Sequence, residues 1–247
     1  MNVKGVVLAG GLGSRLHPLT KVTNKHLLPV YDRPMIHYPI ETLVRAGIGE
    51  ILLVTGGANA GDFLRLLGNG KEFGLRRMHY AYQEGEGGIA EALGLAEAFA
   101  DGSPICVMLG DNVIEKDVNG AVHAFAEDPR GAMLLLKEVD DPERFGVARF
   151  EGERLVGIVE KPKVPPSRLA VTGIYLYDAD VFRIIPTLKR SARGELEITD
   201  VNNDYLRRSA LRWRRLDGWW TDAGTFPSLL RANRLVAELR EREGRRA

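Results

Sequence analysis

Hydrophobic residues in the first half of the chain form short runs, and the segments between these runs carry apolar residues at helical spacing. Four runs that favour strands span positions 3–9, 50–55, 78–83 and 104–111. The segments with helical spacing span positions 34–48, 61–70 and 88–100. The first run is nearly continuous in β-branched and aliphatic residues, which is typical of a strand that is covered on both faces. The alternation predicts an α/β fold with a Rossmann-like, mostly parallel sheet and helices on both faces.

Proline and glycine mark the expected ends of these helices. In the segment 34–48, Pro34 fits the first turn and Gly47 fits the end. Pro39 is expected to distort the early part of this helix. The segment 61–70 also stops at a glycine.

Three loops follow the predicted strands at the edge where a ligand is expected. Open parallel sheets bind their ligands beyond the carboxyl ends of the strands. The loops at this edge begin near Gly10, Gln83 and Gly110. We therefore expect the functional residues of the first half to lie in these loops.

The second half of the chain has a more mixed pattern. Its predicted strands lie at 131–139, within 146–162, at 170–178 and within 212–225, with a hairpin tip at 150–154. Its predicted helices lie at 178–188, 195–209 and 225–243. No low-complexity linker or internal repeat separates the halves, and 247 residues is a usual length for one α/β domain. We expect a single domain over 1–247, with a first half of about 1–115 and a second half of about 116–247.

Composition and charge narrow the class of protein. Hydrophobic residues make up 45% and charged residues 27%, so the chain can bury a large core. The net charge of +1 argues against nucleic acid as a partner, and no apolar run approaches the ~20 residues that span a bilayer. The strand pattern starts at position 3, so no signal peptide is expected. The lone cysteine, Cys106, excludes an internal disulfide, fits a reducing cytoplasm, and is expected to be a core residue.

The loop after the first strand carries the strongest chemical signal. The stretch "LAGGLGSRLHPLTKVTNKHLLP", residues 8–29, combines glycines with Arg15 and Lys25. Backbone N–H groups of glycine-rich loops can approach phosphate closely. The stretch lacks the G-x-x-x-x-G-K-[ST] pattern of a P-loop and the third glycine of a dinucleotide fingerprint. Two added cations suit the charge of a nucleoside triphosphate, although an ordinary turn with a surface arginine remains the structural alternative.

Several motifs together resemble those of the sugar-1-phosphate nucleotidyltransferases. Besides the opening stretch they are "LGDN", "DPERFGVARF", "EKPKVPPS", "AVTGIYLYD", "RGELEITDVNNDYL" and "WWTDAGT". They occur in order over nearly the whole chain, and they are most similar to those of members that use dTTP and glucose 1-phosphate. The resemblance implies transfer of a thymidylyl group to glucose 1-phosphate, with release of pyrophosphate and formation of dTDP-glucose, a precursor of rhamnose and other deoxysugars.

The resemblance also implies roles for individual residues. The dTTP site would comprise Leu8, Gly10, Gly13, Ser14, Arg15, Lys25, Gln83 and Gly88. The glucose 1-phosphate site would comprise Asn112, Gly146, Glu160, Lys161, Val171 and Tyr175. The metal ligands would be Asp111 and Asp222, and the catalytic residues Arg15, Lys25, Lys161 and Asp111. The implied cofactor is Mg²⁺, which commonly takes one or two protein carboxylates, and the implied assembly is a homo-oligomer, a dimer or a tetramer.

Each charged residue also has a plain structural interpretation. Asp222 could cap the helix that follows it, and Asp111 could form a turn with its neighbour Asn112. Glu160 and Lys161 could be a solvated pair before a proline. The residues alone leave these alternatives open, and the family resemblance favours the functional ones.

The implied reaction needs no general base. The attacking phosphate oxygen is already ionised near pH 7, so catalysis would consist of alignment and charge stabilisation during in-line displacement. The five histidines show no spacing typical of metal ligands. Uridylyl transfer, a non-catalytic nucleotide-sugar-binding relative, and a dinucleotide-binding oxidoreductase are the competing hypotheses.

Some positions depart from the pattern that is common in the family. Ser14 replaces threonine, Glu91 replaces glutamine, and Phe145 replaces tyrosine next to Gly146. If Glu91 points toward the base or the sugar, we expect an altered specificity. The chain also stops soon after Arg242, as in the short family form, so a feedback site for a dTDP-sugar is not implied.

Overall fold

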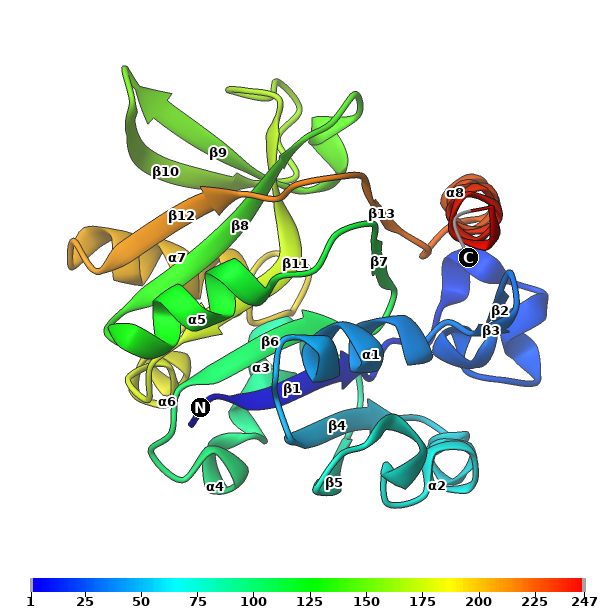
Figure 1. Ribbon diagram of the computed structural model, residues 1–247. Helices are drawn as coiled ribbons and strands as arrows, with labels where there is room; N and C mark the ends of the chain where they lie inside the picture. The colour runs from blue at the N-terminus through cyan, green and yellow to red at the C-terminus, as the bar shows by residue number, and fades with distance from the viewer. Residues whose placement is uncertain (1, 246–247) are drawn as a thin grey trace.

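A nine-stranded sheet runs through the centre of the molecule (Figure 1). The computed structural model describes residues 2–245. The strands of the sheet are β1 (Lys4–Ala9), β4 (Glu50–Gly56), β5 (Arg77–Gln83), β6 (Ile105–Leu109), β8 (Ala132–Glu138), β9 (Gly146–Glu151), β10 (Arg154–Glu160), β11 (Leu169–Tyr177) and β12 (Leu211–Arg215). Along the main path the order is β10-β9-β11-β6-β1-β4-β5, and β8 joins β11 to β12.

The central strands of the sheet are parallel. Strand β1 lies between β4 and β6, and Val7 is opposite Leu53 on one side and Met108 on the other. Strand β5 extends this parallel set beyond β4. Strand β11 then pairs antiparallel with β6 and joins the second half of the chain to the first. The predicted α/β fold, with a central, mostly parallel sheet between helices, is confirmed.

Helices cover both faces of the sheet. One face is covered by α1 (His37–Arg45), α2 (Ala60–Leu67) and α5 (Asn119–Glu127). The other face is covered by α3 (Ile89–Gly94), α4 (Glu97–Ala100), α6 (Val181–Ile184) and α7 (Ile198–Arg207). Successive strand residues point to opposite faces, so Val7 packs in the first core and its neighbours Val6 and Leu8 in the second. This double burial explains why β1 is apolar at consecutive positions.

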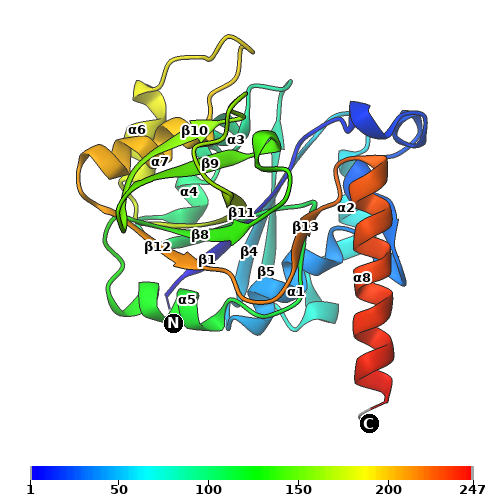
Figure 2. The ribbon, with the colours of Figure 1, turned by 90° about the horizontal axis from the view of Figure 1, so that it is seen from above.

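The last helix, α8 (Phe226–Gly244), packs against the segment that follows β1 (Figure 2). Thr225 and Ser228 cap its N-terminus reciprocally, and Ala232 and Val236 join a third hydrophobic cluster with Leu16 and Val30. The small elements of the contacted segment are η1 (Ser14–Leu16), η2 (Leu19–Lys21), η3 (Lys25–Leu27), β2 (Pro29–Val30) and β3 (Arg33–Pro34). The remaining 3₁₀ turns are η4 (Lys71–Phe73), η5 (Pro142–Arg144) and η6 (Ile185–Thr187).

A two-stranded pairing outside the main sheet brings the middle and the end of the chain together. Strands β7 (Asn112–Ile114) and β13 (Trp220–Asp222) are antiparallel, and Asp222 is opposite Asn112. The N–H of Ala223 donates to the carbonyl of Asp111 at 2.8 Å. The start of β7 and the end of β13 therefore lie beside the carboxyl end of β6.

The predicted helices differ from the observed ones in bounds or continuity, and the helix expected over 178–188 is the short helix α6 followed by the 3₁₀ turn η6. The helix expected from position 34 starts at His37, because Pro34 instead pairs with Pro29 in the β2–β3 hairpin. The helix expected over 88–100 is divided into α3 and α4, between Gly94 and Glu97. The predicted hairpin tip at 150–154 is confirmed by the pairing of β9 with β10.

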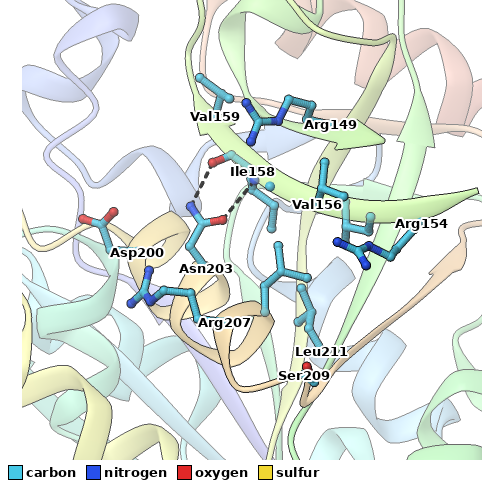
Figure 3. A pocket seen from close by; sticks show the side chains of 13 residues that line it. Arg149, Arg154, Val156, Ile158, Val159, Asp200, Asn203, Arg207, Ser209 and Leu211 are labelled. Atoms are coloured by element: carbon cyan, nitrogen blue, oxygen red, sulfur yellow. Dashed lines mark hydrogen bonds between the residues drawn. The ribbon is translucent and has the colours of Figure 1, made fainter. Parts of the chain in front are cut away.

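The outer edge of the sheet at β10 is covered by a side chain of α7. Asn203 accepts a hydrogen bond from the N–H of Ile158 at 3.0 Å and donates one to its carbonyl at 2.8 Å (Figure 3). A groove of about 740 Å³ surrounds this contact, with Arg149, Arg154 and Arg207 on its walls (Figure 3). Its lining contains none of the residues predicted for the dTTP, sugar or metal sites.

Two further observations concern the position of the lone cysteine and the character of the helices. Cys106 lies fully buried in β6, as expected of a core residue. Between residues 2 and 245, no helix is both long enough and apolar enough to cross a membrane.

Candidate active site

Two cavities adjoin each other beyond the carboxyl ends of β1 and β6. The larger cavity has a volume of about 710 Å³ and the smaller one about 180 Å³. The charged side chains that line both of them are Arg15, Asp111, Arg144, Lys161, Arg193 and Glu195. A reaction between a ligand in one cavity and a ligand in the other would therefore take place among these residues.

Apart from Arg15 and Lys161, which line both cavities, the residues predicted for the two substrates lie in different cavities. The larger cavity is lined by Leu8, Gly10, Gly13, Ser14, Arg15, Lys25, Gln83 and Gly88, which are the eight residues predicted for dTTP. The smaller cavity is lined by Asn112, Gly146, Glu160, Lys161, Val171 and Tyr175, which are the six predicted for glucose 1-phosphate. The structure thus gathers each set, while the role of each residue remains a prediction.

The glycine loop after β1 forms one wall of the larger cavity. Its turn is closed by the hydroxyl of Thr20, which donates to the carbonyl of Gly13 at 2.8 Å. A Cβ atom at Gly13 would lie 2.8 Å from the Cβ of Lys25, so the loop and η3 pack too closely for a larger residue. Arg15 in η1 and Lys25 in η3 therefore both line the larger cavity.

The two predicted metal ligands converge beside Gly224. A Cβ atom built on Gly224 would lie 3.2 Å from Oδ2 of Asp111 and 3.4 Å from Oδ2 of Asp222. Nη2 of Arg15 lies 3.2 Å from the same point. The β7–β13 pairing produces this convergence, because it sets Asp222 opposite Asn112, the neighbour of Asp111.

Asp111 is neutralised by a lysine. Its Oδ2 lies 2.6 Å from Nζ of Lys25, and Nδ2 of Asn112 donates to its Oδ1 at 3.0 Å. Burial raises the pKa of the Asp111 carboxyl, but the charge of Lys25 and these hydrogen bonds outweigh burial and hold the pKa well below its usual range. Asp111 is therefore ionised at neutral pH.

Asp222 is paired with an arginine that the sequence did not single out. Nη2 of Arg144 lies 3.0 Å from both carboxylate oxygens of Asp222, and Nη1 of the same arginine lies 2.6 Å from Asp141. Burial and the nearby charge of Asp111 raise the pKa of Asp222, and the Arg144 charge opposes this increase. Two carboxylates that repel each other and face one point are a suitable pair for a divalent cation.

The donor set suits Mg²⁺ better than a transition metal. Mg²⁺ uses one or two carboxylates and completes its shell with phosphate oxygens and water, whereas Zn²⁺ prefers three or four nitrogen or sulfur ligands. Over residues 2–245 there is no group of three or more His, Cys, Asp or Glu side chains that could hold a metal ion. Asp111 and Asp222 therefore fit a magnesium ion that phosphate oxygens help to hold.

The far end of the larger cavity is built by Gln83 and Gly88. Gln83 ends β5, is buried, and donates through Nε2 to the carbonyl of Gly88 at 3.3 Å. Gly88 has φ of +99°, and a Cβ atom there would lie 2.6 Å from the carbonyl oxygen of Leu196. Only glycine suits this conformation together with such a close approach. The amide of Gln83 is therefore held next to Gly88 in the lining of the larger cavity.

The smaller cavity has a polar rim and an aromatic wall. The carboxylate of Glu160 accepts from the hydroxyl of Thr199 at 2.5 Å and lies 3.6 Å from Nζ of Lys161. Oδ1 of Asn112 accepts from the N–H of Gly173 at 3.1 Å and from Nε1 of Trp220 at 2.6 Å. These contacts fix the Glu160 carboxylate and the Asn112 amide in the lining of the smaller cavity.

Lys161 has an unusual backbone conformation. Its φ is +42°, in the left-handed region that non-glycine residues rarely adopt, and its N–H donates to the carbonyl of Phe145 at 2.9 Å. The turn carries the lysine side chain away from the end of β10 and into both cavities. Strained backbone of this kind concentrates at functional sites.

Several residues that build the site were missed by the sequence reasoning. They are Arg144, Gly173, Arg193, Thr199 and Trp220. The motifs that carried the resemblance contain all five, but their partners lie far away in the sequence. Arg144 and Asp222, for example, are 78 positions apart.

The three departures from the family pattern lie at different places. Ser14 lines the larger cavity, and Phe145 lines the smaller one, with its ring centre 5.0 Å from that of Trp220. Glu91 lines neither cavity, and its carboxylate pairs with Arg190 at 2.5 Å. The condition under which we expected an altered specificity, a Glu91 side chain directed at the base or sugar, is not met in this structure.

Comparisons with known proteins cover nearly the whole chain. The sequence profile described as nucleotidyl transferase matches residues 4–238. A glucose-1-phosphate thymidylyltransferase of an Actinoplanes species is 46% identical over 98% of this chain and 80% of its own, and one of Neisseria meningitidis is 43% identical over 95% and 82%.

Comparison with solved structures shows that the chain also shares its fold with proteins of this kind. A crystal structure of a Bacillus anthracis protein, described as a candidate glucose-1-phosphate thymidylyltransferase in complex with sucrose, superposes with a TM-score of 0.90. It is 53% identical and covers 94% of both chains. A structure of UDP-glucose pyrophosphorylase in complex with UDP-glucose superposes with a TM-score of 0.85 and covers 96% of this chain and 99% of its own. Its sequence is 24% identical, so this similarity shows the fold alone.

Proposed function

The chain belongs to the nucleotidyl transferase family, and we propose that it transfers a thymidylyl group from dTTP to glucose 1-phosphate, giving dTDP-glucose and pyrophosphate. The observation that carries this proposal is the convergence of Arg15, Asp111 and Asp222 beside Gly224, where the two cavities adjoin. The relatives that act as thymidylyltransferases match along nearly the full chain, which supports the same reaction here.

The chemistry of the site is the joining of two anions. The proposal places the triphosphate of dTTP against the glycine loop, Arg15 and Lys25, and the phosphate of glucose 1-phosphate against Lys161. Asp111 and Asp222 would hold Mg²⁺, which when bound supplies positive charge to the phosphate oxygens. Arg15 would stabilise the charge that develops on the α-phosphate and on the departing pyrophosphate.

The phosphate of glucose 1-phosphate is the nucleophile in this proposal. Its oxygen is already ionised, so the protein need only align it with the α-phosphorus, opposite the leaving pyrophosphate. Lys161 reaches both cavities from its strained turn and is suited to aim that oxygen. Glu160, with its carboxylate between Thr199 and Lys161, would accept hydrogen bonds from sugar hydroxyls.

Base recognition is assigned to Gln83 and Gly88. The Gln83 amide can pair with the imide edge of a pyrimidine, and the Gly88 backbone lets a flat base lie close. Thymine and uracil differ by one methyl group, which apolar pockets separate by only about 1–3 kcal/mol. We therefore expect UTP to be a slower substrate rather than an excluded one.

Further features of the proposal follow from the family and the composition. We propose that the enzyme acts in the cytoplasm, in keeping with one fully buried thiol, as a homo-oligomer, either a dimer or a tetramer. Its product would serve pathways to rhamnose or other deoxysugars. Light scattering of the purified protein tests the assembly.

The decisive experiment is a nucleotide panel. The protein is incubated with Mg²⁺, glucose 1-phosphate and each nucleoside triphosphate in turn, and pyrophosphate release is measured. We expect the highest kcat/KM with dTTP, a lower value with UTP, and little turnover with purine nucleotides. A higher kcat/KM with UTP would favour uridylyl transfer instead, and no release with any pair would favour a non-catalytic, nucleotide-sugar-binding role.

A further inference from the structure

The loop between η6 and α7, residues 188–197, crosses both cavities and is called the strap below. Two of its side chains, Arg193 and Glu195, line both the larger and the smaller cavity. Nη2 of Arg193 lies 2.8 Å from Glu197, 3.4 Å from Glu195 and 3.5 Å from Glu160. The position of the strap therefore affects the surroundings of both proposed substrates at once.

The strap is fastened to the loop before α3 by two backbone hydrogen bonds. The N–H of Leu196 donates to the carbonyl of Gly87 at 2.8 Å, and the N–H of Ala90 donates to the carbonyl of Leu196 at 3.2 Å. A Cβ atom at Gly88 would lie 2.6 Å from that same carbonyl oxygen. The strap therefore rests on the segment that, in the proposed function, reads the base.

A single arginine connects the outer part of the strap to α3. Nη2 of Arg190 lies 2.5 Å from Oε2 of Glu91, and Nη1 of the same guanidinium donates to the carbonyl of Gly194 at 2.7 Å. The carboxylate of Glu91 lies so close to Gly87 that a Cβ atom there would overlap it. One guanidinium thus joins the first turn of α3 to the residue that precedes Glu195 and follows Arg193.

We propose that the Glu91–Arg190 ion pair is a positioning latch, which holds the strap over both cavities and so affects kcat/KM for both substrates together. The inference rests on the proposed function for its kinetic consequences and on the hydrogen bonds above for its structural ones. Glu91 is a positioning residue here and touches neither substrate.

The exposure of the Glu91–Arg190 pair fits a role in ordering the strap better than a role in the global stability of the protein. The side chain of Glu91 is 28% exposed and that of Arg190 is 53% exposed. Ion pairs this accessible contribute little to the free energy of unfolding. Holding a loop that carries Arg193 and Glu195 is a different effect, because both side chains line both substrate cavities and small displacements within a substrate site reduce turnover strongly.

The test compares Glu91→Ala, Arg190→Ala and the double variant with the unmodified enzyme. We expect each single change to lower kcat/KM by about 3- to 10-fold for dTTP and for glucose 1-phosphate alike, and the double variant to be no worse than either single one. Arg190→Lys should recover part of the loss, since lysine can pair with Glu91 but cannot bind Gly194 at the same time. Arg183→Ala, which breaks the exposed Asp180–Arg183 pair on α6, is the matched control and should leave both values unchanged.

Hydrogen exchange provides a readout that does not depend on turnover. Loss of the latch should speed exchange at the amides of Leu196 and Ala90 by at least several-fold, while the amides of β1 keep their rates. Unchanged exchange in both single variants overturns the latch, even if the unmodified protein is an active thymidylyltransferase. If the unmodified protein turns over no nucleotide, the proposed function fails, and the exchange rates still decide whether the latch orders the strap. Losses that simply add in the double variant also overturn it.

Discussion

Individual residues of the site differ in what they do for the fold and for the reaction. The side chain of Lys161 is 45% exposed, and it forms a long ion pair with Glu160 at 3.6 Å. Asp111 and Lys25 are each only 12% exposed and form a close pair. Replacing these residues should therefore have similar effects on turnover and different effects on stability.

Lys161→Ala should reduce kcat by at least about 100-fold, because the variant loses the cation that aims the sugar phosphate. The free energy of unfolding should change by less than about 0.5 kcal/mol, since an exposed side chain with one long ion pair is removed. Lys163→Ala is the matched control, an exposed lysine of the same turn that lines neither cavity. Pyrophosphate release and urea unfolding measure the two effects, and near-normal turnover of Lys161→Ala would refute its role.

Asp111→Ala should abolish most turnover and also destabilise the fold. The change leaves the Lys25 ammonium without its 2.6 Å partner in a largely buried position, at a cost of about 1–3 kcal/mol. Adding Lys25→Met should restore much of the stability, because both members of the pair are then gone, but it should not restore turnover. A double variant that is less stable than Asp111→Ala would show that Lys25 has another stabilising partner.

Cys106 should be unreactive in the folded protein. Its side chain is fully buried in β6, and burial raises the pKa of the thiol to about 12. At pH 8 almost no thiolate is present, and the thiolate is the reacting species. We expect no alkylation by a maleimide below the unfolding midpoint and complete alkylation above it. Labelling of the native protein within minutes would contradict this burial.

At the scale of the elements, the sequence predicted the strands better than the helices. Continuous apolar runs identified β1, β4 and β6 because each of these strands is buried on both faces, whereas β5, at the edge of the sheet, is only partly buried. Helix ends were less predictable, because pairing partners outside the helix decided them. The conformational preference of proline suits Pro34 to the first turn of a helix, but in the structure Pro34 pairs with Pro29 in the β2–β3 hairpin.

The candidate site, like the fold, was predictable from the sequence only in part. Glycine, arginine and lysine after the first strand indicated a phosphate loop from local chemistry alone. The proximity of Asp222 to Asp111, and the pairing of Arg144 with Asp222, depend on the β7–β13 register, which no local pattern indicates. For Asp222 the resemblance to a family supplied what the residues alone could not, and Arg144 was missed altogether.

The edge strand β10 owes part of its stability to one amide. Asn203 satisfies both the N–H and the carbonyl of Ile158, a buried residue at the outer edge of the sheet (Figure 3). Asn203→Ala should leave both groups without these partners and lower the free energy of unfolding by about 1–3 kcal/mol. Asn59→Ala, which removes a single hydrogen bond to Asp62, should cost less and serves as the control. Equal urea midpoints for the two variants would contradict this role of Asn203.

At the scale of the molecule, the two halves of the chain share one sheet and the hydrophobic cores on both of its faces. Strand β11 of the second half pairs with β6 of the first, and the core on one face contains Cys106 together with Met133 and Ile174. Strand β13, near the end of the chain, also pairs with β7 from its middle. A cut near position 115 would therefore expose a sheet edge and divide a core.

We accordingly expect the two halves to unfold in one cooperative transition. All three tryptophans, Trp213, Trp219 and Trp220, lie in the second half, so their fluorescence reports on that half, and the accessibility of the Cys106 thiol reports on the first. In urea the two signals should change at the same midpoint, and the calorimetric and van't Hoff enthalpies should agree. Chains of this length can unfold through intermediates, so the result is not trivial. A tryptophan transition that precedes thiol exposure would mean that the second half opens while the parallel strands remain folded, and the single-domain prediction would then be wrong.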